Sequence, residues 1–263
     1  MIEADRQPDF DGLYGAVRAS AERLRTSLEQ LTDRQAREPS LLPGWSRGHV
    51  LTHLARSADA YRWTFALART GTAPGPRADA AELARQLGEG AGRGAEALVA
   101  DLRAALDGLL RDAAELPAAR RAVLVPALAG WRHPAWYLLW RAWRELEVHG
   151  VDLNHGLTPS GWPDGFVRRA LAETAATLGA RGIPLARVEA EDLGSGWTVS
   201  GSGPVVRGPG RVLLTWLAGR GSAADLRVDG VAVPGLRVDG AVSGLDALPA
   251  LPTWPLPPVP GWG

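Results

Sequence analysis

The chain has 263 residues, 46% of them hydrophobic and 22% charged, which is the balance of a globular protein with one large or two modest domains. Its 29 basic and 29 acidic residues give a formal net charge of +0, so these totals indicate no basic face and argue against nucleic acid as a partner. The absence of Cys and Lys excludes disulfides, thiolate ligands, a cysteine nucleophile and a lysine Schiff base. Any thiol chemistry must therefore use a thiol from outside the chain.

The N-terminal ten residues are charged and lack the apolar core of a signal peptide. No stretch reaches 18 uninterrupted apolar residues, the length expected of a membrane span. These two features predict a cytoplasmic protein that has no membrane partner.

The first part of the chain has the apolar spacing of helices. Apolar residues recur at steps of three and four, as on the buried face of an amphipathic helix. Ser46 is a natural N-cap, and the glycines between 88 and 94 predict an interruption. The predicted helices span residues 11–38, 47–68, 79–116 and 134–151. Four long helices joined by loops predict an antiparallel four-helix bundle.

The pattern changes after about residue 156. One more helix is predicted at 165–181, followed by short alternating segments separated by glycine-rich turns, which are typical of a small antiparallel sheet. The predicted strands are 187–193, 197–200, 205–207, 226–228 and 235–238, with a short helix at 210–218. The tail from Ala247 is rich in Pro and Trp and should be extended. The predicted fold class is α+β, mainly α, with a helical bundle at 1–158 and a small α+β domain at 159–263.

Histidines and a glutamate at helical spacing are the candidates for chemistry. His49 and His53 lie four residues apart on one predicted helix, and Glu145 and His149 lie four apart on another. Side chains from two helices of a bundle can converge on one point in the core. Imidazole and carboxylate suit zinc, nickel or another borderline divalent ion, and three protein ligands would leave a position open, as in a catalytic site.

The spacing also admits a simpler interpretation. A histidine on an apolar helix face is more often a hydrogen-bonded core residue than a ligand, and Glu145 could pair with Arg141 or Arg144. The spacing alone leaves both interpretations open.

Two segments resemble a known family. The sequences LPGWSRGHVLTHL at 42–54 and RELEVHGVDL at 144–153 resemble the mycothiol-dependent maleylpyruvate isomerase family, one of the DinB-like metal-binding bundles. The resemblance covers the whole helical domain, and the segment after residue 160 also looks like the family's C-terminal domain. The two motifs are specific for the family and much less specific for the substrate.

The resemblance implies roles for particular residues. The family's metal ligands fall on His53, Glu145 and His149. Asp152 could orient the imidazole of His149 or form only a helix-terminal salt bridge. His49 could face the substrate, support the ligands or simply cap its helix. The family's C-terminal domain supplies an arginine to the active site, and Arg220 is the candidate here, with Arg227 and Arg237 as alternatives.

The resemblance also implies the chemistry. A divalent metal, with zinc as the first choice, would activate mycothiol as cofactor or cosubstrate for attack on a small electrophile, and the expected reaction is cis–trans isomerisation of maleylpyruvate. One alternative is a mycothiol S-transferase, in which the thiol stays attached to the substrate. A third is a non-catalytic metal- or ligand-binding module. The bundle could be a monomer or a small homo-oligomer.

Overall fold

The computed structural model describes residues 9–127, 130–221 and 225–229. Within these ranges the chain divides into two compact units between Thr158 and Pro159. Each unit has its own buried core, so each is described by itself.

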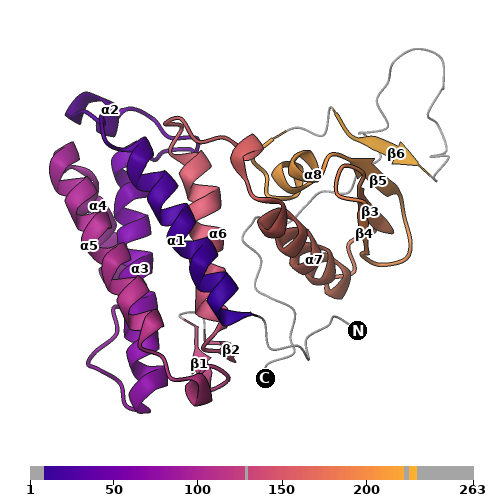
Figure 1. The fold of residues 1–263 in the computed structure, drawn as a ribbon. Coiled ribbons are helices and arrows are strands. Elements are labelled where there is room, and N and C mark those ends of the chain that lie inside the picture. Colours follow the sequence, from indigo (N-terminus) through magenta and orange to yellow (C-terminus); the bar gives the residue numbers. More distant parts are fainter. Residues whose placement is uncertain (1–8, 128–129, 222–224, 230–263) are drawn as a thin grey trace. The chain divides into compact units, whose positions relative to one another are not determined.

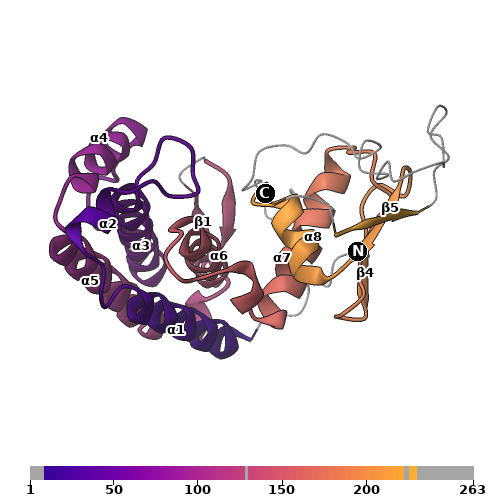
Figure 2. The same cartoon turned by 90° about the horizontal axis from the view of Figure 1, so that it is seen from above.

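Four long helices form the first unit, and they surround a common core (Figures 1 and 2). They are α1 (Phe10–Ser27), α3 (Arg47–Thr70), α5 (Ala95–Ala114) and α6 (Tyr137–Asp152). α1 packs against α5 and α6, and α3 packs against the same two helices. Each helix contributes an apolar stripe to the core. Leu24, Leu51, Leu102 and Trp140 are completely buried there, one from each helix.

The directions of the four helices differ in part from the predicted antiparallel order. α3 and α6 are antiparallel, but α3 and α5 run in the same direction, because Arg56 pairs with Asp101 and Arg62 with Asp112 in ascending order along both helices. The extra helix α4 (Ala80–Ala91) explains this order. It packs along α3 and carries the chain back before α5 begins, in the manner of a bundle with a long crossover connection.

Two predicted helix boundaries were wrong for local reasons. The first predicted helix, 11–38, ends at Ser27, because Thr32 starts the separate helix α2 (Asp33–Arg37) through a capping box with Gln35. The helix predicted from 134 starts only at Tyr137. Before α6 the chain forms a short 3-10 helix η1 (Ala118–Arg120) and a hairpin of β1 (Leu124–Pro126) with β2 (Arg132–Pro134).

Close packing fixes the N-terminal turn of α3. A Cβ on Gly48 would lie 2.5 Å from the carbonyl oxygen of Ala91, and a Cβ on Gly90 would lie 2.4 Å from the side chain of Thr52. Only glycine at these two positions lets α3 and α4 come this close. The contact holds the turn of α3 that carries His49 and His53.

The second unit is a small sheet with two helices, following the 3-10 turn η2 (Pro159–Gly161). Its helices are α7 (Asp164–Ala180) and α8 (Gly210–Leu217), and its strands are β3 (Arg187–Ala190), β4 (Ser195–Thr198), β5 (Val205–Gly208) and β6 (Arg227–Asp229). The strand order is β4-β3-β5-β6. α7 contacts α8 and β4, and α8 contacts β3 and β5.

The sheet is mixed rather than wholly antiparallel as predicted. β3 pairs antiparallel with β4 but parallel with β5. β4 reverses the chain once, and the turn before β5 reverses it again, so β5 runs along the other edge of β3 in the same direction. The fold class, mainly helical with a small α+β part, is confirmed. The strand predicted at 235–238 and the extended tail lie outside the described residues.

Candidate metal centre

The start of α3 positions two histidines. Ser46 caps the helix by accepting a hydrogen bond from the backbone N–H of His49, and the ring Nδ1 of His49 accepts one from the N–H of Ser46 at 3.2 Å. This reciprocal capping box fixes the first turn of α3. His53 follows one turn later, and its ring lies 5.5 Å from that of Trp45. The capping box therefore fixes the start of α3, and His53 lies on the same face of this helix as His49.

The end of α6 contributes the other donors. Glu145 and His149 lie one turn apart on the face that meets α3. Asp152 is completely buried, and its Oδ2 accepts a hydrogen bond from Nδ1 of His149 at 2.8 Å. Because Nδ1 donates to Asp152, Nε2 is the ring nitrogen that faces Glu145 and His53, and it could bind a metal once it has lost its proton.

Three donors meet between the two helices. Nε2 of His53 lies 3.1 Å from Oε2 of Glu145, and Nε2 of His149 lies 3.3 Å from the same oxygen. All three donor atoms fall within 4.8 Å of one another. The side chains of His53, Glu145 and His149 are 32%, 15% and 11% exposed, so the group is sheltered but open on the side of His53. Among the described residues, no other group of three such donors comes this close.

The electrostatics of the group favour charge on Glu145. Burial alone would raise the pKa of Glu145, but the hydrogen bonds and charges of His149 and His53 outweigh burial and hold this pKa well below its usual range. Burial would lower the pKa of His149, but Asp152 and Glu145 reverse that effect and raise it to about 9. The metal-free protein thus stabilises an extra positive charge where a divalent cation would lie.

The donor set fits a metal ion. Two imidazoles and one carboxylate are ligands that zinc and other borderline divalent ions accept, and three protein donors leave a coordination position open. The Asp152 carboxylate behind His149 is the usual arrangement behind a metal-binding imidazole. The alternative partners of Glu145 considered above do not occur: Glu145 contacts His53, His149 and the hydroxyl of Tyr61, and pairs with neither Arg141 nor Arg144.

A buried arginine that the sequence did not single out joins the two ligand-bearing helices. Arg47 is 9% exposed, and its Nε and Nη2 donate to the carbonyl oxygens of Leu153 and Asn154, each at 2.9 Å. Its Nη1 donates to Glu38 at 2.6 Å. A cation at the C-terminal end of a helix is favourable, because the last carbonyl groups there are unpaired. Arg47 therefore ties the end of α6 to the start of α3.

The other predicted site residues lie in different settings. His49 serves as the cap described above, and its ring also stacks on Trp45. Arg220 follows α8 in the second unit and donates to the carbonyl oxygen of Ala218 at 2.8 Å. Arg227 is exposed and pairs with Glu191, and Arg237 lies outside the described residues. The structure brings Asp152 to the triad, while the roles of His49 and Arg220 stay predictions.

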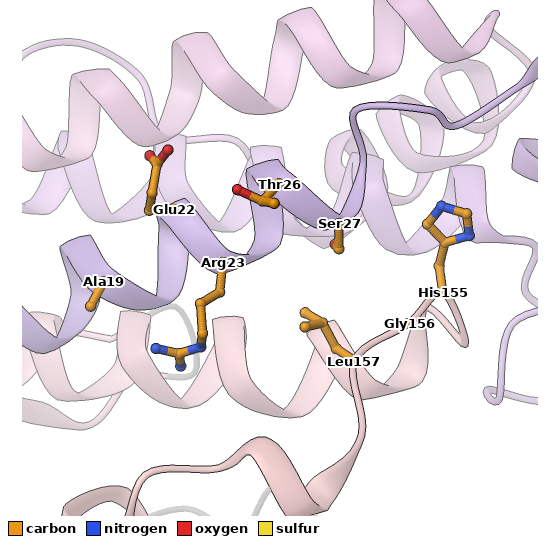
Figure 3. A pocket seen from close by; sticks show the side chains of 8 residues that line it. All are labelled: Ala19, Glu22, Arg23, Thr26, Ser27, His155, Gly156 and Leu157. Atoms are coloured by element: carbon orange, nitrogen blue, oxygen red, sulfur yellow. The ribbon is translucent and has the colours of Figure 1, made fainter.

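A separate cavity of about 750 Å³ lies between α1 and the segment after α6 (Figure 3). It contains none of the three donors. Its lining residues are Ala19, Glu22, Arg23, Thr26, Ser27, His155, Gly156 and Leu157. The cavity is therefore not the candidate metal centre. In the described ranges, none of the helices combines the length and apolar character needed to cross a membrane.

The fold and the geometry define a four-helix bundle with a candidate metal site between two of its helices. The family model described as the mycothiol maleylpyruvate isomerase N-terminal domain matches residues 17–154, and the chain belongs to this family. The family assignment made from the two sequence motifs is thereby confirmed.

Solved structures agree with the assignment. The crystal structures of the mycothiol-dependent maleylpyruvate isomerase and of a histidine-to-alanine mutant of it each match with a TM-score of 0.77 and 22% identity, over 86% of this chain and 95% of theirs. At this identity the match shows a shared fold. No curated protein matches the chain.

Proposed function

We propose that this chain is a metal- and mycothiol-dependent isomerase that acts on maleylpyruvate or a closely related electrophile. The proposal is carried by the meeting of His53, Glu145 and His149 within 4.8 Å, with Asp152 behind His149. Family membership supports the choice of thiol and substrate.

The three donors would hold a divalent ion, with zinc as the first choice. A bound divalent ion lowers the pKa of a thiol that coordinates it, so that thiolate is present at neutral pH. Asp152 fixes the tautomer and the ring plane of His149. Trp45, packed against His53, shields one side of the group from water. The chain thus provides a partly dry, preorganised site for a cation.

The thiol would do the covalent chemistry. Its sulfur adds to one carbon of the cis double bond of maleylpyruvate, and the electron pair of that double bond moves onto the conjugated carbonyl group. The former double bond is then a single bond and can rotate. Elimination of the thiolate restores the double bond as the trans isomer, fumarylpyruvate, and regenerates the thiol. No atom is gained or lost by the substrate.

The test is turnover of maleylpyruvate by the zinc-loaded protein with and without mycothiol, followed by ultraviolet absorbance and mass spectrometry. We expect fumarylpyruvate of unchanged mass, formed only when the thiol is present. A stable adduct heavier by one mycothiol would instead identify an S-transferase. Full metal occupancy without turnover across a panel of electrophiles would identify a binding module.

We expect Arg220→Ala to leave the metal content unchanged and to lower kcat/KM by about tenfold or more, because one charge-assisted contact to a substrate carboxylate would be lost. The measurement is metal content by atomic emission together with steady-state kinetics. Arg187→Ala is the matched control, since Arg187 belongs to the same unit, pairs with Glu189 and is not among the candidate arginines. Equal kcat/KM values for the two variants would mean that another arginine binds the substrate carboxylate.

A further inference from the structure

Two arginines of the helical unit, one of them a helical turn from the metal centre, have no carboxylate partner among the described residues. Arg141 precedes Glu145 by one turn on α6, which is about 6 Å along the helix axis. Arg77 lies between α3 and α4, and its Nη1 donates to the carbonyl oxygen of Pro126 at 3.2 Å. Neither guanidinium forms an ion pair with any carboxylate in the part of the chain that the structure describes. Both Nε atoms are buried and lack a hydrogen-bond partner there.

Aromatic rings hold both guanidinium groups in place. Cζ of Arg141 lies 5.2 Å from the ring centroid of Tyr61 and 5.4 Å from that of Trp131. Cζ of Arg77 lies 5.2 Å from the ring centroid of Trp63. Contacts with aromatic faces stabilise a cation and orient its plane, but they leave its N–H groups unpaired. The guanidinium groups of Arg77 and Arg141 are therefore held in place by aromatic rings, and each still has N–H groups that could donate to a ligand.

The two cations also oppose each other. Both groups contact the hairpin of β1 and β2: Arg77 donates to Pro126, Arg141 lies over Trp131, and the carbonyl oxygen of Trp131 accepts from the N–H of Ala127, next to Pro126. Burial lowers the pKa of Arg77, and the charge of Arg141 lowers it further. Sheltering two like charges without a counterion is costly. No ion pair among the described residues compensates the charges of Arg77 and Arg141. A bound anion would lower the free-energy cost of sheltering them.

A buried histidine faces the same charges. His133 is 0% exposed, and its Nδ1 donates to the carbonyl oxygen of Pro134 at 2.9 Å, so its Nε2 is a buried acceptor without a partner. Burial lowers the pKa of His133 to about 4, with smaller contributions from the charges of Arg141 and Arg77. Its ring lies 5.0 Å from that of Trp131. One cluster thus contains three unpaired polar atoms: Nε of Arg77 from the loop, Nε2 of His133 from the hairpin and Nε of Arg141 from α6.

We propose that Arg77 and Arg141 form a carboxylate-binding subsite that holds one end of a small, flat dicarboxylate electrophile, one helical turn from the metal centre. This inference rests on the proposed function. A planar guanidinium fork matches a carboxylate in two parallel hydrogen bonds, and the aromatic walls suit a flat, conjugated ligand. Anchoring one carboxylate here would direct the rest of the substrate toward the triad.

The test is isothermal titration of the zinc-loaded protein with maleate, a flat four-carbon dicarboxylate that needs no thiol and no turnover. Arg141→Gln and Arg77→Gln are each expected to weaken maleate binding by about tenfold or more, since each removes one charge-assisted contact. Arg132→Gln is the matched control. Arg132 is an exposed arginine of the same hairpin and donates only to the carbonyl oxygen of Leu124. Its removal should change the dissociation constant by less than about twofold.

Metal content and circular dichroism accompany each titration. If Arg141→Gln does not fold, Arg77→Gln carries the test, because Arg77 lies outside the helices. Equal affinities for both variants and the Arg132 control would overturn the subsite, as would maleate binding that depends on zinc alone. The outcome is separate from that of the proposed function: maleate binding that depends on Arg141 without any isomerase turnover would refute the reaction but retain the subsite. Turnover of maleylpyruvate together with maleate binding that does not depend on Arg141 would support the reaction and refute the subsite.

Discussion

The His149→Ala and His53→Ala variants are expected to lose most of their bound metal, with affinity reduced by more than about 100-fold. The reason is that even residues that only orient a ligand contribute about 10- to 100-fold to metal affinity. Each substitution removes one of three donors and opens a position to water. Thiol-dependent turnover should fall with the metal. The measurement is zinc content after dialysis, together with competition against a chelator of known affinity.

Helical content should stay nearly intact in both variants. The core of the bundle is formed by apolar residues such as Leu51 and Trp140, which the substitutions do not touch. His155→Ala is the matched control, since His155 follows the end of α6 but lies outside the triad. Full zinc content and full turnover in the His149 or His53 variant would contradict the ligand assignment. Loss of zinc in the His155 variant as well would point to a general loss of structure.

Local sequence patterns predicted the helices that carry the donors. Steps of three and four residues define a helix face, so the pairing of Glu145 with His149 and the cap at Ser46 follow from spacing within one segment. The family motifs then selected His53 over His49 as a ligand. In the structure, Nδ1 of His49 takes part in the capping box, while Nε2 of His53 lies 3.1 Å from Glu145; the role of His53 as a ligand stays a prediction.

Contacts between distant segments could not be predicted in this way. Arg47 is one of 29 arginines, and nothing in its neighbours indicates that it binds carbonyl groups more than 100 residues away. The parallel pairing of β3 and β5 depends on how the chain returns after β4, which strand patterns do not encode. The cluster of Arg77, His133 and Arg141 joins a loop, a hairpin and a helix, so only the folded chain reveals it.

Raising the pH from 7 to 9 is expected to strengthen zinc binding by about tenfold per pH unit, with the slope flattening near pH 9. Asp152 and Glu145 outweigh burial and raise the pKa of His149 to about 9, so below that pH the metal-free imidazolium must lose the proton on Nε2 before it can bind. The pKa of Glu145 is held well below its usual range, so that carboxylate releases no proton. Calorimetry in two buffers with different ionisation heats measures the number of protons released.

Asp152→Asn separates the proton effect from the geometry of the site. An asparagine oxygen can still accept the Nδ1–H of His149, so the ring orientation is kept, but the charge that raises the pKa of His149 is gone. Fewer protons should be released per zinc at pH 7.5, and the dependence of affinity on pH should flatten at a lower pH than in the unaltered protein. An affinity that does not change between pH 7 and 9 in the unaltered protein would mean that His149 carries no proton to displace, and its assignment as a ligand would then lose its electrostatic support. Unchanged proton release in the Asp152 variant would instead mean that Glu145 alone stabilises the imidazolium.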